Sequence, residues 1–361
     1  MTDREAQIFH WIAENPMISQ EELAQKAGIK RSSVAVHISN LMRKGYIQGK
    51  GYIMNTPLYC TVIGGANMDI GGVSDEVLID NDSNPGTTTI SLGGVGRNIA
   101  HNIALLGAEV KFITALGNDM YARQIIDNCD SLGIDIKESL YAQDAATSTY
   151  LYIADQSGEM HVAISDMKIY DKITPEFISR KMDKINFGKL AVVDTNIPQE
   201  TLCYIADHCK IPLFGETVSG KKAGKLLPIL EKLHTITPNK MEAEILSGIA
   251  ICDKTSLEAA AEALLAKGVK NIFITLGKNG VYCTDGKKAF YEPVIEGKLV
   301  NTTGAGDAFI AALAYAYTQN LSLQDSARLA AAASSIAIES KQTINPQLSI
   351  AEAAARANIV L

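Results

Sequence analysis

Residues 301–309 read N-T-T-G-A-G-D-A-F, and a strongly apolar helical stretch follows them. Glycines let the backbone N–H groups of Gly304, Ala305 and Gly306 point at one spot, and the helix dipole adds positive potential there. We therefore predict a hole for an anion or an anionic transition state, with Asp307 beside it as a base that takes a proton from a hydroxyl. A bare G-x-G-D also fits an aspartate that caps a tight turn.

Upstream of this stretch, short apolar runs alternate with helical stretches from residue 58 onward. Strands buried on both faces appear in sequence as nearly continuous apolar runs. The pattern predicts an α/β fold, a doubly wound and mostly parallel sheet covered by helices on both faces. The expected strands are 59–66, 111–117, 189–196, 211–217, 235–239 and 271–277, and the expected helices include 97–107, 257–267 and 304–318.

Two segments of this body, about 71–92 and 145–166, have the alternation of β-strands without helices between them. They predict a small antiparallel sheet that acts as a lid over the site. We therefore expect one large domain over 57–361 that carries this lid.

Polar residues follow several of the expected strands, where ligands bind in open α/β sheets. Asn67 and Asp69 follow the first strand, and an aspartate that accepts two hydrogen bonds suits a sugar diol. Gly93 and Gly94 lead into a helix with Asn98 in its first turn, where an amide suits vicinal hydroxyls. A surface turn and helix–strand packing are the alternative interpretations of these two motifs.

Two further strand ends suit a nucleotide. Asn239 and Glu242 lie three residues apart on a starting helix, share a face, and suit the waters of Mg²⁺. The turn in T-L-G-K-N-G-V, residues 275–281, lets phosphates approach the backbone. Capping of the helix by Asn239 is the alternative for the first motif.

Residues 1–56 form a separate expected domain, with three short helices and a basic hairpin. Thr2 with Glu5 and Ser19 with Glu22 have the spacing of capping boxes. This arrangement predicts a winged helix-turn-helix whose third helix enters the major groove of DNA. A helical protein–protein module remains the alternative. The candidate DNA contacts are Arg31, Ser32, Ser33, His37, Lys44 and Lys50.

The charge is divided between the two parts. Residues 1–54 hold seven basic and five acidic residues, whereas the rest of the 361-residue chain holds 26 basic and 35 acidic residues, for a net charge of −7. The six cysteines form no C-x-x-C pair, which fits a reducing compartment. Neither a signal peptide nor an apolar run of about 18 residues is present, so we expect a cytoplasmic protein without a membrane span.

Taken in order, these motifs resemble the ribokinase-like, or PfkB, carbohydrate kinases from residue 58 to the end. The pair G-G-V-G-R-N (93–98) and T-G-A-G-D (303–307) carries the resemblance. It implies transfer of the γ-phosphoryl group of ATP to a sugar hydroxyl, with Asp307 as base and 304–306 as anion hole. It further implies Mg²⁺ at Asn239 and Glu242. The implied ATP contacts are Asn239, Thr275, Gly277, Gly280, Asn301 and Thr303, and the implied ribose contacts are Asn67, Asp69, Gly93, Gly94 and Asn98.

Within the family, D-S-N-P-G (82–86) and P-N-K-M-E-A-E (238–244) resemble the pseudouridine kinases. That branch implies a nucleoside substrate, with pseudouridine as first choice and cytidine, inosine, guanosine or a free sugar behind it. The base would then lie near Ser148, Thr149, Ser165 and Asp166. A homodimer formed through the lid is also expected. A nucleoside-sensing transcriptional regulator is the competing hypothesis.

Two residues depart from the family pattern. Asn301 stands where the family usually has an aspartate that helps to bind a monovalent cation, so the resemblance does not extend to activation by K⁺. Glu216 stands where the pseudouridine branch tends to have aspartate.

Overall fold

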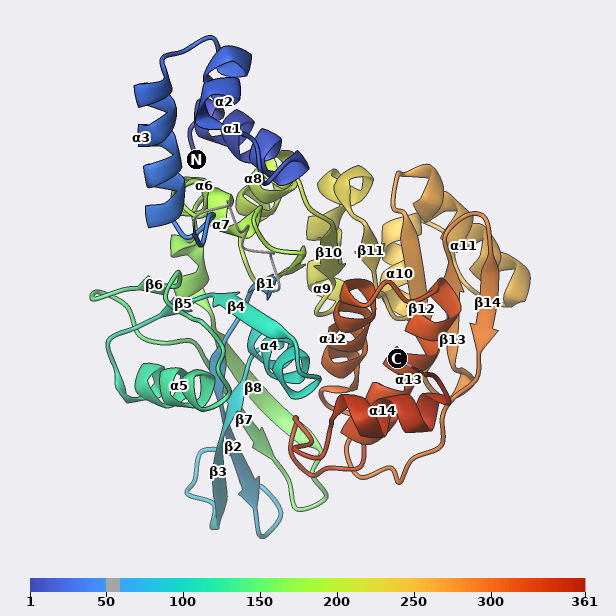
Figure 1. The fold of residues 1–361 in the computed structure, drawn as a ribbon. Coiled ribbons are helices and arrows are strands. Elements are labelled where there is room, and N and C mark those ends of the chain that lie inside the picture. Colours follow the sequence, from blue (N-terminus) through green and yellow to red (C-terminus); the bar gives the residue numbers. More distant parts are fainter. Residues whose placement is uncertain (50–58, 361) are drawn as a thin grey trace. The chain divides into compact units, whose positions relative to one another are not determined.

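The computed structural model describes residues 1–49 and 59–360, and the chain divides into two compact units, Met1–Pro57 and Leu58–Leu361 (Figure 1). Each unit has its own core. The helices over the described residues lack the length of apolar sequence that a membrane-spanning helix needs.

The first unit contains the three predicted helices, α1 (Asp3–Glu14), α2 (Gln20–Ala27) and α3 (Arg31–Arg43). The Thr2–Glu5 and Ser19–Glu22 capping boxes both form, which confirms the predicted helix starts. The core consists of apolar residues at helical spacing, among them Ile8, Ile12, Leu23, Val34, Ile38 and Leu41. The second half of the predicted hairpin, including Lys50, lies outside the described residues.

The second unit is built on an eight-stranded sheet with the order β14-β13-β12-β11-β10-β9-β1-β4. Its strands from β4 to β12 pair in parallel, and β13 and β14 add an antiparallel edge. The mostly parallel sheet is thereby confirmed. The strands are β1 (Tyr59–Ile63), β4 (Glu109–Ile113), β9 (Leu190–Asp194), β10 (Leu213–Glu216), β11 (Thr235–Ile236), β12 (Asn271–Thr275), β13 (Val281–Thr284) and β14 (Ala289–Glu292).

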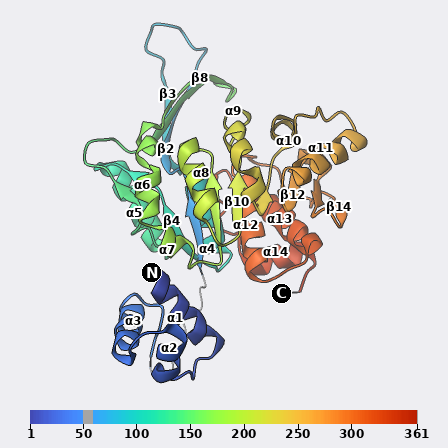
Figure 2. The same cartoon turned by 90° about the horizontal axis from the view of Figure 1, so that it is seen from above.

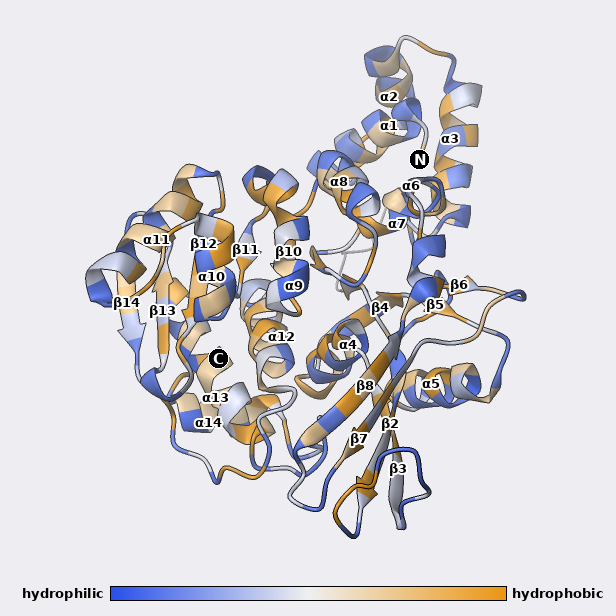
Figure 3. Ribbon diagram, turned by 180° about the vertical axis from the view of Figure 1, so that it is seen from behind, coloured by the Kyte–Doolittle hydropathy of each residue, from blue (hydrophilic) through white to orange (hydrophobic). Residues whose placement is uncertain are grey.

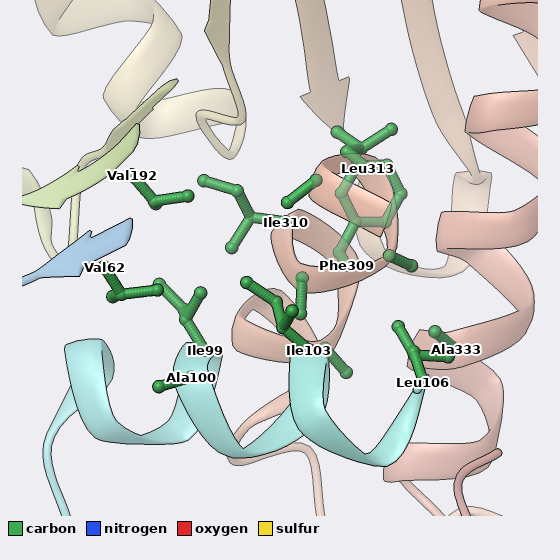
Figure 4. Close-up of a cluster of buried hydrophobic side chains, with 14 of the residues drawn as sticks. Val62, Ile99, Ala100, Ile103, Leu106, Val192, Phe309, Ile310, Leu313 and Ala333 are labelled. Atoms are coloured by element: carbon green, nitrogen blue, oxygen red, sulfur yellow. The ribbon is translucent and has the colours of Figure 1, made fainter. Parts of the chain in front are cut away.

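Helices cover both faces of this sheet, as expected for a doubly wound fold. Val62 and Val192 face one core with Ile99, Ile103 and Phe309 (Figure 4), while the alternate strand residues face a second core. The helices are α4 (Val95–Leu105), α5 (Met120–Ser131), α6 (Pro175–Ser179), α7 (Met182–Ile185), α8 (Gln199–His208), α9 (Gly220–Ala223), α10 (Lys240–Ser247), α11 (Lys254–Ala266), α12 (Ala305–Thr318), α13 (Leu323–Ala337) and α14 (Ile350–Ala357), with 3-10 turns η1 (Lys168–Lys172), η2 (Gly224–Lys232) and η3 (Gly277–Asn279).

A second sheet extends beyond the edge of the large one (Figure 2) and has the order β3-β2-β7-β8. The expectation of a purely antiparallel sheet is wrong, because β2 and β7 pair in parallel. The short strands β5 and β6 form a separate pair. The bounds are β2 (Asn67–Ser74), β3 (Gly86–Gly93), β7 (Thr149–Ala154), β8 (Met160–Asp166), β5 (Ala115–Leu116) and β6 (Leu140–Tyr141).

Candidate active site

Asp307 lies in the first turn of α12, directly after the glycine turn. Gly304 has a φ of +86°, and a Cβ there would lie 2.2 Å from the Thr343 carbonyl oxygen, so only glycine fits. Ala305 N–H donates to the Thr302 carbonyl over 3.4 Å. The N–H groups of Gly304 and Gly306 have no hydrogen-bond partner within the described residues, as the first turn of a helix leaves them.

The Asp307 carboxylate is half-buried and accepts a hydrogen bond of 2.7 Å from Asn98 Nδ2. Burial and the nearby charge of Asp194 raise the pKa of Asp307 to about 7, against the opposing effects of Asn98 and Arg97. A carboxylate with this pKa takes and releases protons near neutral pH, as general base catalysis needs.

Arg97 is a site residue that the sequence interpretation did not single out. Its guanidinium is buried, and it donates to the carbonyl oxygens of Leu92 (2.9 Å) and Gly93 (3.0 Å) and to Asn98 Oδ1. These bonds turn the Asn98 amide so that its nitrogen faces Asp307. The sequence did contain one signal for Arg97. A basic residue in the first turn of a helix is unfavourable next to the positive end of the helix dipole, so its presence there indicates a specific partner.

Asp69 and Asn67 lie next to the glycine pair that precedes α4. Asn67 Nδ2 donates to Asp69 Oδ1 over 2.6 Å, and burial raises the pKa of Asp69. A Cβ on Gly93 would lie 2.4 Å from Asp69 Oδ2. Gly94 has a φ of +95°, and a Cβ there would lie 2.5 Å from Ala66 Cα. Both glycines therefore let the start of β2, which carries Asp69, approach the start of α4.

A cavity of about 750 Å³, whose lining residues are mostly polar (the polar cavity), opens beside Asp69. Asp69 lines it, together with Asn301 and Thr303, which were expected along ATP instead. Asn301 Oδ1 accepts from Thr303 N–H (3.0 Å) and its Nδ2 donates to the Lys341 carbonyl (3.3 Å). The other lining residues include Thr89, Ser91, Arg97, His101, Asn128, Tyr150, Tyr152, Met160 and Gln342.

The four lid residues expected near a base, Ser148, Thr149, Ser165 and Asp166, are not among the residues that line this cavity. Strand alternation explains two of them, since Thr149 pairs with Asp166 on the face opposite Tyr150 and Tyr152. Ser148 is buried before β7 and donates to the Asp166 carbonyl, while Ser165 is exposed.

A second, mainly apolar cavity of about 430 Å³ lies beside the start of α12. The predicted Thr275, Gly277 and Gly280 line it with Ala305 and Gly306. Gly280 has a φ of +83°, and a Cβ there would lie 2.2 Å from the Glu292 carbonyl oxygen. Its apolar walls consist of Val281, Pro293, Val294, Ile295, Leu299, Phe309 and Ile338.

Asn239 and Glu242 form a capping box at the start of α10. Asn239 Oδ1 accepts from Glu242 N–H (3.0 Å), and Glu242 Oε2 accepts from Asn239 N–H (2.9 Å) and Thr217 Oγ1 (2.7 Å). The alternative role of Asn239 as a helix cap is thus present in the structure. Within residues 1–49 and 59–360, no three His, Cys, Asp or Glu side chains converge as metal ligands.

Glu216 is buried close to Glu242. It accepts from Thr237 Oγ1 (2.9 Å) and Val218 N–H (3.1 Å). Burial, with the charges of Asp307 and Glu242, raises the pKa of Glu216 to about 8.

Asp194, at the end of β9, is a second residue that the sequence interpretation missed. It is buried and accepts from the N–H groups of Gly65 and Asn196, each at 2.8 Å. A Cβ on Gly64 would lie 2.3 Å from its Oδ2. Asp194 therefore fixes the loop before Asn67 and places a negative charge near Asp307.

In the N-terminal unit, the candidate DNA contacts differ in their surroundings. Arg31 and Ser32 are exposed, and Ser33 and His37 are half-buried. Lys44 instead forms an ion pair of 2.7 Å with Glu5, whose side chain is buried. Lys44 therefore has a structural role inside this unit.

Comparison with known proteins adds independent findings. Residues 58–350 match the family model described as pfkB family carbohydrate kinase, and residues 7–48 match that of the winged helix-turn-helix DNA-binding domains. The uncharacterized sugar kinase YeiI of Escherichia coli is 38% identical over 97% of both chains. The pseudouridine kinase of the same organism is 38% identical over 81% of this chain and 94% of its own. The crystal structure of ribokinase from Thermotoga maritima has a TM-score of 0.75 at 25% identity and covers 83% of this chain and 99% of its own.

Proposed function

This chain belongs to the PfkB family of carbohydrate kinases, a family of phosphotransferases that act on a hydroxyl group, and we propose that it phosphorylates the ribose 5′-hydroxyl of a nucleoside, with pseudouridine as first substrate. The observation that carries the proposal is the carboxylate of Asp307. It has a pKa of about 7, Asn98 holds it, and it follows a turn flanked by one polar and one apolar cavity.

The polar cavity is the proposed nucleoside side. Asp69, which lines this cavity, would accept hydrogen bonds from the ribose diol. Asn67 and Gly93 lie next to its carboxylate, and Gly94 and Asn98 follow at the start of α4. The likeness to E. coli pseudouridine kinase at 38% identity supports pseudouridine over the other nucleosides.

The apolar cavity is the proposed nucleotide side. Its walls, including Val281, Leu299 and Phe309, suit the face of an adenine ring. Thr275, Gly277 and Gly280 line the same cavity and would follow the nucleotide toward the glycine turn.

In the proposed reaction, Asp307 takes the proton of the 5′-hydroxyl while the hydroxyl oxygen forms a bond to the γ-phosphorus of ATP. The bond between that phosphorus and the bridging oxygen of ADP breaks, and ADP leaves. The free N–H groups of Gly304 and Gly306 would stabilise the charge on the transferring phosphoryl group. Closure of the lid sheet over the polar cavity would exclude water, so that the phosphoryl group reaches the nucleoside and is not hydrolysed.

The oxygen donors near α10 fit a hydrated Mg²⁺. Glu216 and Glu242 supply hard carboxylate oxygens, and Mg²⁺ keeps most of its own waters. Bound there with ATP, the ion would neutralise phosphate charge. Glu242 and Asn239 would hold it through water, since their direct hydrogen bonds already cap the helix. Asn301 donates to a carbonyl where a cation-binding carboxylate would accept, so we propose no K⁺ requirement.

Product analysis tests this function. Incubation with pseudouridine, ATP and Mg²⁺, followed by phosphorus NMR, is expected to give ADP and the nucleoside 5′-monophosphate in equal amounts. ATP hydrolysis without nucleoside phosphate, or a phosphate on another hydroxyl, would contradict it.

A second function is proposed for the N-terminal unit, because residues 7–48 match a winged helix-turn-helix and α3 exposes Arg31 and Ser32. It would bind DNA, and a nucleoside in the kinase unit would change the affinity. A gel shift with the promoter of its own operon at low salt, with and without pseudouridine, tests this. No shift at low salt would refute it.

The lid sheet, β3-β2-β7-β8, has one face toward the polar cavity, and its opposite face supports a homodimer. On that opposite face, the exposed apolar residues are Ile90 on β3, Leu151 on β7, and Val162 and Ile164 on β8. Figure 3 shows hydrophobic residues along β7 and β8 by their colour. An exposed apolar patch of this kind marks an interaction surface, and a second copy of the lid is the proposed partner. Light scattering on wild type and Val162→Lys tests it, with a dimer expected for wild type and a monomer for the variant.

A further inference from the structure

One nitrogen of the Arg97 side chain touches two other residues of the polar cavity. Arg97 Nη1 lies 3.3 Å from His101 Nδ1 and 3.4 Å from Asn128 Oδ1. His101 follows Arg97 by one turn of α4, whereas Asn128 comes from α5. Both residues line the cavity that also contains Asp69.

These contacts fix which atoms of the two residues can donate. A guanidinium has only donors, so His101 Nδ1 must accept from it. A neutral imidazole then carries its proton on Nε2, and burial beside Arg97 keeps the ring neutral by lowering its pKa to about 4. For the same reason Asn128 turns its oxygen to Arg97, which leaves its NH₂ group as the free end.

His101 Nε2 and Asn128 Nδ2 have no hydrogen-bond partner in the part of the chain that the structure describes. The cavity therefore contains two donors whose orientation a single buried cation sets. Two donors match a ligand with two acceptors, and they reject a ligand that presents an amino group at the same place, because its donor would stay unpaired.

We propose that His101 and Asn128 select the nucleobase by donating to the carbonyl oxygens of a uracil-type ring. This inference rests on the proposed nucleoside kinase function. A uracil-type base has two carbonyl oxygens, whereas cytosine replaces one of them with an amino group and adenine has none. Tyr150 and Tyr152 line the same cavity and supply aromatic surface for the face of the ring.

Binding without ATP tests the proposal apart from catalysis. Isothermal titration of the full chain with pseudouridine, uridine, cytidine, adenosine and ribose is expected to rank the two uracil-type nucleosides first. The affinity for these two nucleosides is expected to exceed that for cytidine and adenosine about tenfold or more, because one unpaired buried group has an effect of this size. The variant His101→Phe is expected to bind uracil-type nucleosides with about tenfold lower affinity and to bind ribose with unchanged affinity.

Three further variants complete the design. His101→Gln retains a donor and is expected to recover part of the loss. Asn128→Leu removes the other donor and should reproduce the selective loss if His101→Phe fails to fold. His208→Phe removes an exposed imidazole on α8 and should bind as wild type does.

The proposal would be overturned if His101→Phe and Asn128→Leu lost affinity equally for uridine, cytidine, adenosine and ribose. A wild-type chain that binds adenosine most tightly would also overturn it. A wild type that binds uracil-type nucleosides selectively yet phosphorylates none would refute the proposed function and still support the two donors.

Discussion

Asn98 Nδ2 donates to Asp307 Oδ2 over 2.7 Å, and this bond joins two residues 209 positions apart in the sequence. It connects the first turn of α4 to the first turn of α12. Arg97 fixes the other end of the Asn98 amide. The proposed base is thus held by the glycine-rich motif on the nucleoside side, so that substrate position and base position depend on the same residues.

Removal of the base is the first prediction. Asp307→Asn keeps the size of the side chain but cannot accept a proton, so kcat is expected to fall about 10³-fold, within the usual range for a positioned base. Nucleoside binding measured by titration should change little. Asp130→Asn, at an exposed position of α5, is the matched control and should keep full activity. A near-normal kcat in Asp307→Asn would contradict the assignment of Asp307 as the general base.

The second prediction concerns pH. Asp307 must be ionised to act, so kcat/KM should rise with pH through about 7. The bond from Asn98 stabilises the carboxylate and lowers its pKa. Asn98→Ala should therefore raise the pKa of Asp307 and move the acid side of the pH profile to higher pH. A lower rate with an unmoved profile would mean that Asn98 acts on binding alone.

The third prediction links Glu216 to stability. Its pKa is about 8 in the folded chain against an ordinary value of 4.5, so the folded state holds the proton more tightly than the unfolded state does. Stability is therefore lost as pH rises from about 4.5 to about 8. Glu216→Gln should raise Tm relative to wild type at about pH 9 and have little effect at about pH 4. The same Tm difference at both pH values would mean that ionisation of the buried Glu216 carboxyl does not cause the loss.

The fourth prediction concerns Gly93. A Cβ at this position would lie 2.4 Å from Asp69 Oδ2, so Gly93→Ala must displace the carboxylate that is proposed to hold ribose. KM for the nucleoside should rise roughly tenfold, while KM for ATP stays near wild type. Gly224→Ala is the control, because nothing lies within 4 Å of its added Cβ. An unchanged KM for the nucleoside would argue against Asp69 as a ribose contact.

The fifth prediction tests the structural role of Lys44 in the N-terminal unit. Lys44→Met removes the ion-pair partner of the buried Glu5 carboxylate, which should lower the free energy of unfolding of this unit by about 2 kcal/mol. The single tryptophan of the chain, Trp11, lies in α1, so its fluorescence during urea unfolding reports on this unit. Glu5→Gln combined with Lys44→Met should recover part of the loss. An unchanged midpoint for Lys44→Met would show that the ion pair contributes nothing.

Much of the fold could be predicted because its signals are local. Capping boxes, apolar runs and the glycine turn before α12 each depend on a few neighbouring residues. The parallel pairing of β2 with β7 could not be predicted, since it depends on how distant strands meet. The face on which Thr149 and Asp166 lie could not be predicted either, because a strand has two faces and the sequence does not say which one meets the cavity. In the structure these two residues pair on the face opposite Tyr150 and Tyr152.

The candidate site shows the same division. Asn98 and Asp307 were recognisable as polar residues at helix starts, but their contact arises only when α4 and α12 pack together. Arg97 was missed because an arginine in a single sequence looks like a surface residue, and its partners at Leu92, His101 and Asn128 come from three different elements. Asp194 was missed because its role depends on the glycines of another strand end.

The most direct test of the central claim is the kcat/KM of the wild-type chain with ATP and Mg²⁺ across pseudouridine, uridine, cytidine, inosine, guanosine, adenosine and ribose. We expect pseudouridine to give the highest value, with ADP and the 5′-monophosphate as products. Phosphorylation of none of these acceptors, or a higher value for ribose than for every nucleoside, would contradict the assignment of this chain as a nucleoside kinase.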